Sequence, residues 1–256
     1  MKKIIIAFLM SMTPMLVLAA GGGMKNYSVD IDLDNKASLQ RGAKLFVNYC
    51  LSCHSAKAMR YNRMALDLGM TEKQVEDNLI FTADYSKKPE GEPSKVGSLM
   101  EVAMRTKDAK QWFGTKIPDL SVVSRARGAD WLYTYLLTFY IDESRPYGMN
   151  NQRFPSVGMP HVLWELEGLK KAVYKTEKGA DGKDHKVISG FEIVEPGQMS
   201  KVEYDNAMRD LVNYMVYMGE PVLMERKTLG VWVMLFLIIF FFVSYAMKKE
   251  FWKDIH

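Results

Sequence analysis

Residues 38–54 read SLQRGAKLFVNYCLSCH and join an amphipathic segment to a C-x-x-C-H motif. Apolar side chains recur on one face of this segment at helical spacing, namely Leu39, Ala43, Phe46 and Val47. This pattern predicts a helix over residues 38–50 that ends at the first cysteine.

The C-x-x-C-H motif is typical of the attachment site of a c-type haem. Two thiols one helical turn apart can each bond a vinyl group of the same porphyrin, and the next residue then directs an imidazole at the iron. We therefore expect Cys50 and Cys53 to hold one haem c covalently and His54 to be its proximal iron ligand.

Two other chemistries use the same spacing. A redox C-x-x-C site of the thioredoxin type follows a strand and precedes a helix, whereas here the predicted helix comes first. A structural zinc ion needs four protein ligands, and the remaining histidines are His161, His185 and His256. Haem is the favoured interpretation, and using both cysteines for it suits an oxidising compartment.

Both ends of the chain are apolar. Lys2 and Lys3 precede an apolar stretch that ends in Ala19-Ala20-Gly21, which predicts a signal peptide over residues 1–20. Residues 21–37 are expected to form a mobile leader with little to bury. Residues 229–247 carry no charge and would be ~28 Å long as a helix, enough to cross a bilayer.

The charges around this second apolar stretch indicate its orientation. We expect a transmembrane helix over 228–247, with Lys248, Lys249 and Lys253 holding the tail 248–256 in the cytoplasm. The domain over 38–227 then lies in the periplasm of a bacterial inner-membrane protein. Removing the signal peptide and the tail from the net charge of +4 leaves about +1, which argues against a nucleic-acid partner.

The segments between the two ends are predicted to be mainly helical with long loops. A capping box at 71–74 begins a short helix, and a second helix covers 130–140 with Asp130 as its N-cap. Residues 85–98 and 146–160 are expected to be irregular, and 174–194 to form a hairpin. The last helix of the domain covers 199–218, with one apolar face made of Val202, Met208, Leu211, Val212, Met215 and Met218.

The second axial ligand is not fixed by spacing alone. Met159 stands in a loop before Pro160, which restrains it towards an extended backbone. It could equally be a buried loop methionine, and His161 is a rival ligand. Similarly, Arg125 or Arg127 could pair with an anionic haem propionate or could be a solvated surface charge.

Several motifs, in order along the chain, resemble the cytochrome c1 family. They are Arg41-Gly42 with the C-x-x-C-H motif, Met59-Arg60-Tyr61-Asn62-Arg63, Pro118-Asp119-Leu120-Ser121, Arg125-Ala126-Arg127, Phe154-Pro155, Gly158-Met159-Pro160, Glu220-Pro221 and the final anchor. The chain departs from the family pattern at Ile117, where proline is common, at Trp131, which is often tyrosine, and in a shortened glycine run after Arg127.

The resemblance implies a fold, a cofactor and partners. The fold would be a cytochrome c-like haem domain followed by one C-terminal transmembrane helix. Met159 would be the distal iron ligand, Arg127 would bind a propionate, and Pro118 would be among the haem-binding residues.

The resemblance further implies single-electron transfer from the Rieske iron–sulfur protein to a cytochrome c, beside a cytochrome b subunit. The complex would be the respiratory ubiquinol:cytochrome c reductase. An independent membrane-anchored monohaem carrier linked to a terminal oxidase is the alternative, and a haem enzyme or gas sensor would need an open sixth position.

Overall fold

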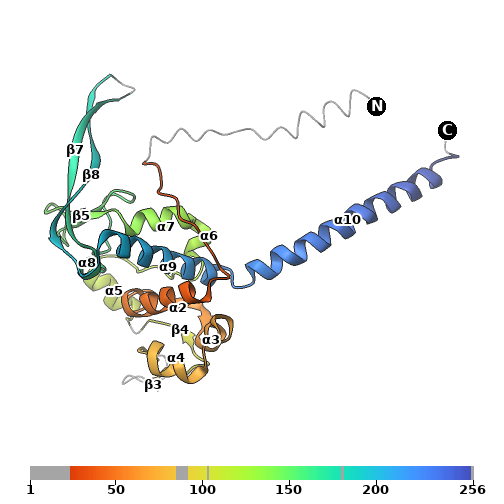
Figure 1. Ribbon diagram of the computed structural model, residues 1–256, viewed down its shortest axis with the longest axis horizontal. Coiled ribbons are helices and arrows are strands. Elements are labelled where there is room, and N and C mark those ends of the chain that lie inside the picture. The colour runs from red at the N-terminus through yellow and green to blue at the C-terminus, as the bar shows by residue number, and fades with distance from the viewer. Residues whose placement is uncertain (1–23, 85–91, 103, 180–181, 255–256) are drawn as a thin grey trace.

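The computed structural model describes residues 24–84, 92–102, 104–179 and 182–254, and it is mainly helical (Figure 1). The helices are α2 (Lys36–Leu45), the π-helical turn η1 (Phe46–Cys50), α3 (Tyr61–Leu68), α4 (Glu72–Leu79), α5 (Thr106–Phe113), α6 (Val123–Arg127), α7 (Ala129–Leu136), α8 (Trp164–Glu167), α9 (Lys201–Gly219) and α10 (Leu223–Phe251). The mainly α fold with one C-terminal apolar helix is thus confirmed.

The strands form antiparallel pairs rather than one sheet. β1 (Ala56–Arg60) pairs with β4 (Leu99–Met100), β2 (Ala83–Asp84) with β3 (Glu92–Pro93), β5 (Phe139–Ile141) with β6 (Met149–Asn151), and β7 (Gly168–Lys178) with β8 (Asp184–Pro196). The last pair is a long hairpin that projects from the helical body (Figure 1).

The core of the domain forms where α2 crosses α9. Gly42 makes the crossing close, because a Cβ atom at this position would lie 2.0 Å from the carbonyl oxygen of Asp210. The side-chain carboxylate of Asp210 accepts hydrogen bonds from Ser38 Oγ at 2.6 Å and from Arg41 Nε at 2.6 Å. These contacts fix the helix that leads into Cys50.

The described part of the leader is not free of the domain. Tyr27 N donates to Thr134 Oγ1 at 2.8 Å, and Asp32 N donates to Asn213 Oδ1 at 3.1 Å. Val29, Ile31 and Leu33 pack against the core. The prediction that this segment has little to bury is therefore wrong, because its alternating apolar side chains pack against the core and its backbone is hydrogen-bonded to α7 and α9.

Several element boundaries differ from the sequence predictions. The helix expected over 130–140 ends at Leu136, and Phe139 lies in β5, which pairs with β6 inside the stretch expected to be irregular. The N-cap of α7 is Gly128 rather than the predicted Asp130. Val202 was expected on the buried face of α9 but is 68% exposed, since it stands in the first turn.

Other local predictions are confirmed. Thr71 and Gln74 form the predicted capping box of α4. Ser200 and Glu203 form a second capping box at α9, which is not among the sequence predictions. The hairpin exists and is longer than predicted. The signal-peptide prediction, residues 180–181 of the predicted turn and residues 85–91 of the loop predicted over 85–98 lie outside the described residues.

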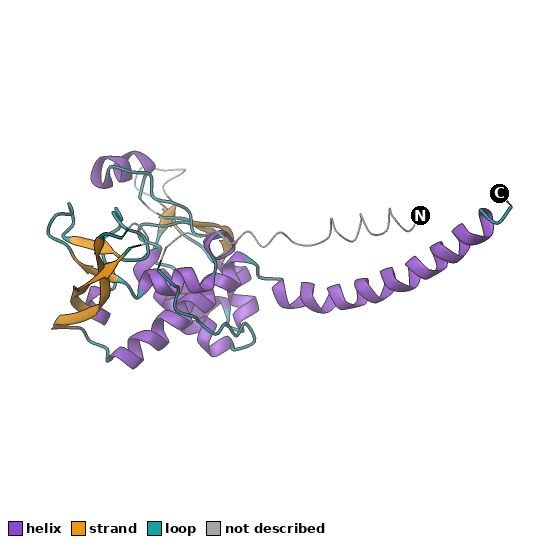
Figure 2. Cartoon of the chain, turned by 90° about the horizontal axis from the view of Figure 1, so that it is seen from above, coloured by secondary structure: helices purple, strands orange, loops and turns teal. Residues whose placement is uncertain are grey.

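Helix α10 runs away from the domain in both views (Figure 2). It is continuous from Leu223 to Phe251 and has no buried residue, so it extends the predicted span at both ends. It is long and apolar enough to cross a membrane. In the described part of the chain it is the one helix that meets this test.

Candidate haem site

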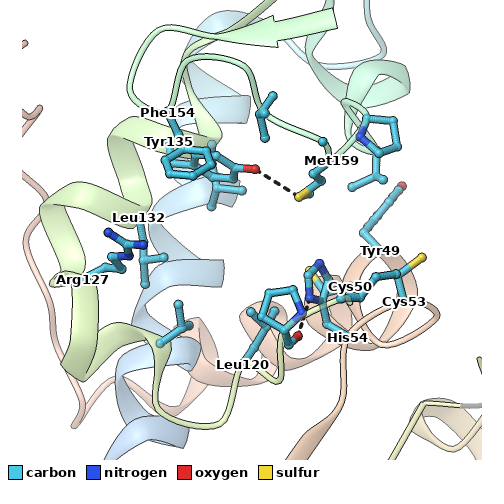
Figure 3. Close-up of a pocket in the computed structure, with 18 of the residues that line it drawn as sticks. Tyr49, Cys50, Cys53, His54, Leu120, Arg127, Leu132, Tyr135, Phe154 and Met159 are labelled. Atoms are coloured by element: carbon cyan, nitrogen blue, oxygen red, sulfur yellow. Dashed lines mark hydrogen bonds between the residues drawn. The ribbon is translucent and has the colours of Figure 1, made fainter. Parts of the chain in front are cut away.

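A cavity of about 390 Å³ opens between the C-x-x-C-H motif and the loop that carries Met159. Its walls come from η1, α5, α6, α7 and α9, and they are predominantly apolar. Figure 3 shows the motif on one side of this cavity and Met159 on the opposite side.

The two cysteines lie together at the end of η1. Backbone bonds from Cys53 N and His54 N to Cys50 O, of 3.1 and 2.8 Å, close the chain into a tight turn. Both side chains line the cavity, Cys50 buried and Cys53 half-buried. Burial, and then the nearby Cys53, raises the pKa of the Cys50 thiol to about 12. Both cysteines thus line the same cavity, as attachment to one porphyrin requires.

His54 is oriented by a backbone carbonyl. Its Nδ1 lies 2.8 Å from the oxygen of Pro118, which fixes Nδ1–H as the donor and leaves Nε2 free to bind a metal. Burial lowers the pKa of His54, although the Pro118 carbonyl and the Asp119 charge oppose this. A neutral imidazole is the form that ligates iron.

The loop after Pro118 is held from several directions. Asp119 accepts from Ser121 N at 2.9 Å and from Lys57 N at 3.0 Å, and Leu120 N donates to Ser55 O at 2.8 Å. Burial opposes ionisation of Asp119, but the hydrogen bonds outweigh it and lower its pKa. These bonds position the carbonyl that orients His54.

Met159 faces the motif across the cavity, in a loop between Gly158 and Pro160 (Figure 3). Tyr135 on α7 donates a hydrogen bond to Met159 Sδ at 3.3 Å. Burial raises the pKa of Tyr135, so its hydroxyl remains a donor. Two thiols, an imidazole and a thioether around an apolar cavity are the set that a c-type haem uses.

The rival ligand His161 does not line the cavity. Its ring is buried and stacks on Phe139, with centroids 4.9 Å apart. Of the two residues that the sequence leaves open as distal ligands, Met159 is the one that the structure brings to the cavity.

Arg127 on α6 lines the cavity, whereas Arg125 does not. The guanidinium carbon of Arg127 lies 5.0 Å from the ring centroid of Trp131, and that of Arg153 lies 5.6 Å from the same centroid. A cation at the cavity edge can pair with an anionic propionate. Sequence patterns missed Arg153 and Tyr135, because their partners are distant in sequence and no motif marks them.

No cluster of His, Cys, Asp or Glu side chains that could hold a bare metal ion occurs among residues 24–84, 92–102, 104–179 and 182–254.

Comparisons with known proteins agree with this chemistry. The model of the Cytochrome C1 family matches residues 31–255. The chain is 47% identical to "Cytochrome c1" of Allochromatium vinosum over 256 residues, which cover 100% of both chains. It is 46% identical to "Ammonia monooxygenase gamma subunit" of Nitrosomonas europaea, over 100% of this chain and 98% of that one. Identity to "Cytochrome c1" of Rhodospirillum rubrum is 25%, over 86% and 83% of the two chains.

Proposed function

The chain belongs to the cytochrome c1 family, and on this premise we propose that it accepts electrons from a Rieske iron–sulfur protein and passes them to a cytochrome c. It would do so with one covalent haem c as the electron-transfer subunit of a ubiquinol:cytochrome c reductase. The observation that carries the proposal is the placement of His54 and Met159 on opposite sides of one cavity, beside both cysteines.

The haem, when bound, supplies one-electron redox chemistry at its iron. The chain's own residues determine what else can happen there. His54 and Met159 would both ligate the iron, which would leave no coordination site open to substrates or small ligands. The thioether and the apolar walls would favour the ferrous state and raise the reduction potential. Arg127 at the cavity edge would bind a propionate.

The membrane topology is part of the same proposal. Residues 1–20 would be a cleaved signal peptide, 21–37 a leader, 38–227 the periplasmic haem domain, 228–247 the transmembrane segment and 248–256 a cytoplasmic tail. Helix α10 would keep the haem domain beside a cytochrome b subunit in the bacterial inner membrane.

A second candidate follows from the relative of comparable identity named as an ammonia monooxygenase subunit. On that interpretation the same haem domain would serve an ammonia monooxygenase. An independent monohaem carrier linked to a terminal oxidase is a third possibility. The three differ in the proteins that accompany the chain.

The test is to tag the chain, solubilise native membranes mildly and analyse what co-purifies. Haem b, a Rieske cluster and quinol-driven reduction of a covalent haem c support the proposed reductase. A haem c that co-purifies with an ammonia monooxygenase, or alone, refutes it. Cys50→Ala with Cys53→Ala tests attachment separately, because mass spectrometry should then find no haem on the chain.

A further inference from the structure

Buried charged groups lie on the side of the Met159 loop that faces away from the cavity. Pro160 and Val162 line the cavity, as Met159 does, whereas the intervening His161 points away from it. The His161 side chain is only 2% exposed. Its ring lies nearly parallel to that of Phe139, at an interplanar angle of 6°.

Glu167 lies next to His161, and Lys170 lies next to Glu167. His161 Nε2 lies 2.8 Å from Oε2 of Glu167, at the end of α8. The other carboxylate oxygen of Glu167 pairs with Nζ of Lys170 on β7. Lys170 Nζ also donates to the carbonyl of Leu137 at 2.7 Å, just after α7. The series of side-chain contacts from His161 through Glu167 to Lys170 thus joins the methionine loop to α8, β7 and α7.

These groups are largely withdrawn from water. The side chains of Glu167 and Lys170 are 12% and 9% exposed. Buried charges are stable only where they meet opposite charges or hydrogen-bonding groups at defined positions. His161 Nε2 and Glu167 Oε2 face each other and have no hydrogen-bond partner among the described residues. Displacing the loop would therefore leave each of these buried atoms without its polar neighbour, which is unfavourable.

The network also reaches the sulfur of Met159 through packed rings. Phe139, which stacks on His161, meets the ring of Tyr135 at 5.1 Å in an edge-on contact. Tyr135 in turn donates to Met159 Sδ. The methionine is therefore restrained at its backbone by the loop and at its sulfur by Tyr135.

We propose that His161, Glu167 and Lys170 form a buried clamp that holds Met159 in position to ligate the haem iron. They are positioning residues, since none of them lines the cavity. The inference rests on the proposed haem function and adds to it what keeps the sixth position closed.

The test uses the full-length haem-loaded protein in detergent. Glu167→Gln removes the central charge at nearly constant volume, and His161→Phe keeps the ring stack but removes the contact with Glu167. Haem content is measured first. The readouts are the absorption band of the ferric iron–methionine bond, the reduction potential, and the fraction of ferrous protein that binds carbon monoxide.

We expect both variants to weaken the methionine band and lower the potential, and the fraction that binds carbon monoxide to rise about tenfold. Two controls are matched to them. Lys175→Met breaks an exposed ion pair with Glu177 on the same hairpin. Leu68→Ala opens a cavity in the core, at a buried residue that does not line the haem cavity.

The inference is overturned if Glu167→Gln and His161→Phe match the unaltered protein in all three readouts. It is equally overturned if Leu68→Ala opens the sixth position as far as they do, because general destabilisation would then account for the effect. An unaltered protein without covalent haem, or with two histidine ligands, would instead refute the proposed site itself.

Discussion

Tyr135 donates a hydrogen bond to Sδ of Met159 at 3.3 Å, across 24 residues of sequence. This bond draws electron density from the sulfur that faces the haem cavity. A thioether that donates less electron density to the iron stabilises the ferric state less, so the bond should favour the ferrous state. A change at Tyr135 on α7 should therefore change the reduction potential of the haem.

Tyr135→Phe should therefore lower the reduction potential by about 40 mV, which corresponds to losing ~1 kcal/mol of preferential stabilisation of the ferrous form. Redox titration of the haem absorption measures it. Tyr133→Phe is the control on the same helix, since its hydroxyl is 3.5 Å from the carbonyl of Asp205 and does not contact the methionine. Equal potentials for the Tyr135 variant and the unaltered protein would show that the bond does not tune the iron.

Arg127→Gln should lower the potential by about 50 mV, because a cation beside the haem favours the less positive ferrous form. Arg125→Gln is the matched control, two residues away on the same short helix but outside the cavity. Redox titrations at low and high ionic strength compare the two. If both variants shift the potential equally, Arg127 has no specific propionate contact.

The fold could be predicted where local patterns are strong. The helix before Cys50, the capping box at Thr71 and the apolar C-terminal helix each depend on residues close in sequence. The apolar spacing of α7 continues to Phe139 and predicts a helix there. The pairing of Phe139 with Asn151 in a strand is a longer-range contact that periodicity does not report.

The residues of the candidate site also differ in how well local sequence predicts them. Cys50, Cys53 and His54 belong to one motif of five adjacent residues, so the sequence alone predicts their roles. Spacing alone could not choose between Met159 and His161, because the choice depends on which side of the loop faces the cavity. In the structure Met159 lines the cavity, whereas His161 does not and lies beside Glu167.

Gly42→Ala should destabilise the domain by about 2–3 kcal/mol, since the added methyl group would collide with α9 and force α2 away from it. Thermal unfolding of the haem-loaded protein, followed by circular dichroism, measures the loss. Gly190→Ala on the hairpin is the control, because nothing lies within 4 Å of a Cβ atom there. Indistinguishable melting of the two variants would mean that α2 and α9 do not approach as described.

Asp119→Asn should make the protein less stable at neutral pH and less sensitive to acid. The pKa of Asp119 lies below its ordinary value of 3.8 in the folded protein. Its stabilising effect is therefore present above about pH 3.8 and is lost as the pH falls through the lower folded value.

The asparagine keeps one acceptor oxygen for Ser121 N or Lys57 N, so we expect a loss of about 1 kcal/mol at pH 7. Denaturant unfolding at pH 7 and at pH 3 measures both effects. A constant difference between variant and unaltered protein at the two pH values would contradict a role for the ionised carboxylate.

A chain that ends at Lys227 should be water-soluble and keep the haem site. Every described residue of α10 is at least partly exposed, so removing the apolar stretch uncovers no core side chain. Arg226 and its ion-pair partner Glu220 remain at the new end. Expressed with its N-terminal residues, the shortened protein should appear in the soluble periplasmic fraction with the absorption spectrum of the full chain.

Lys248→Ala with Lys249→Ala in the full chain is the companion variant, which should keep the haem domain on the membrane. A shortened chain that stays membrane-bound would show that a second segment anchors the protein, and one that loses the methionine absorption band would show that α10 supports the site.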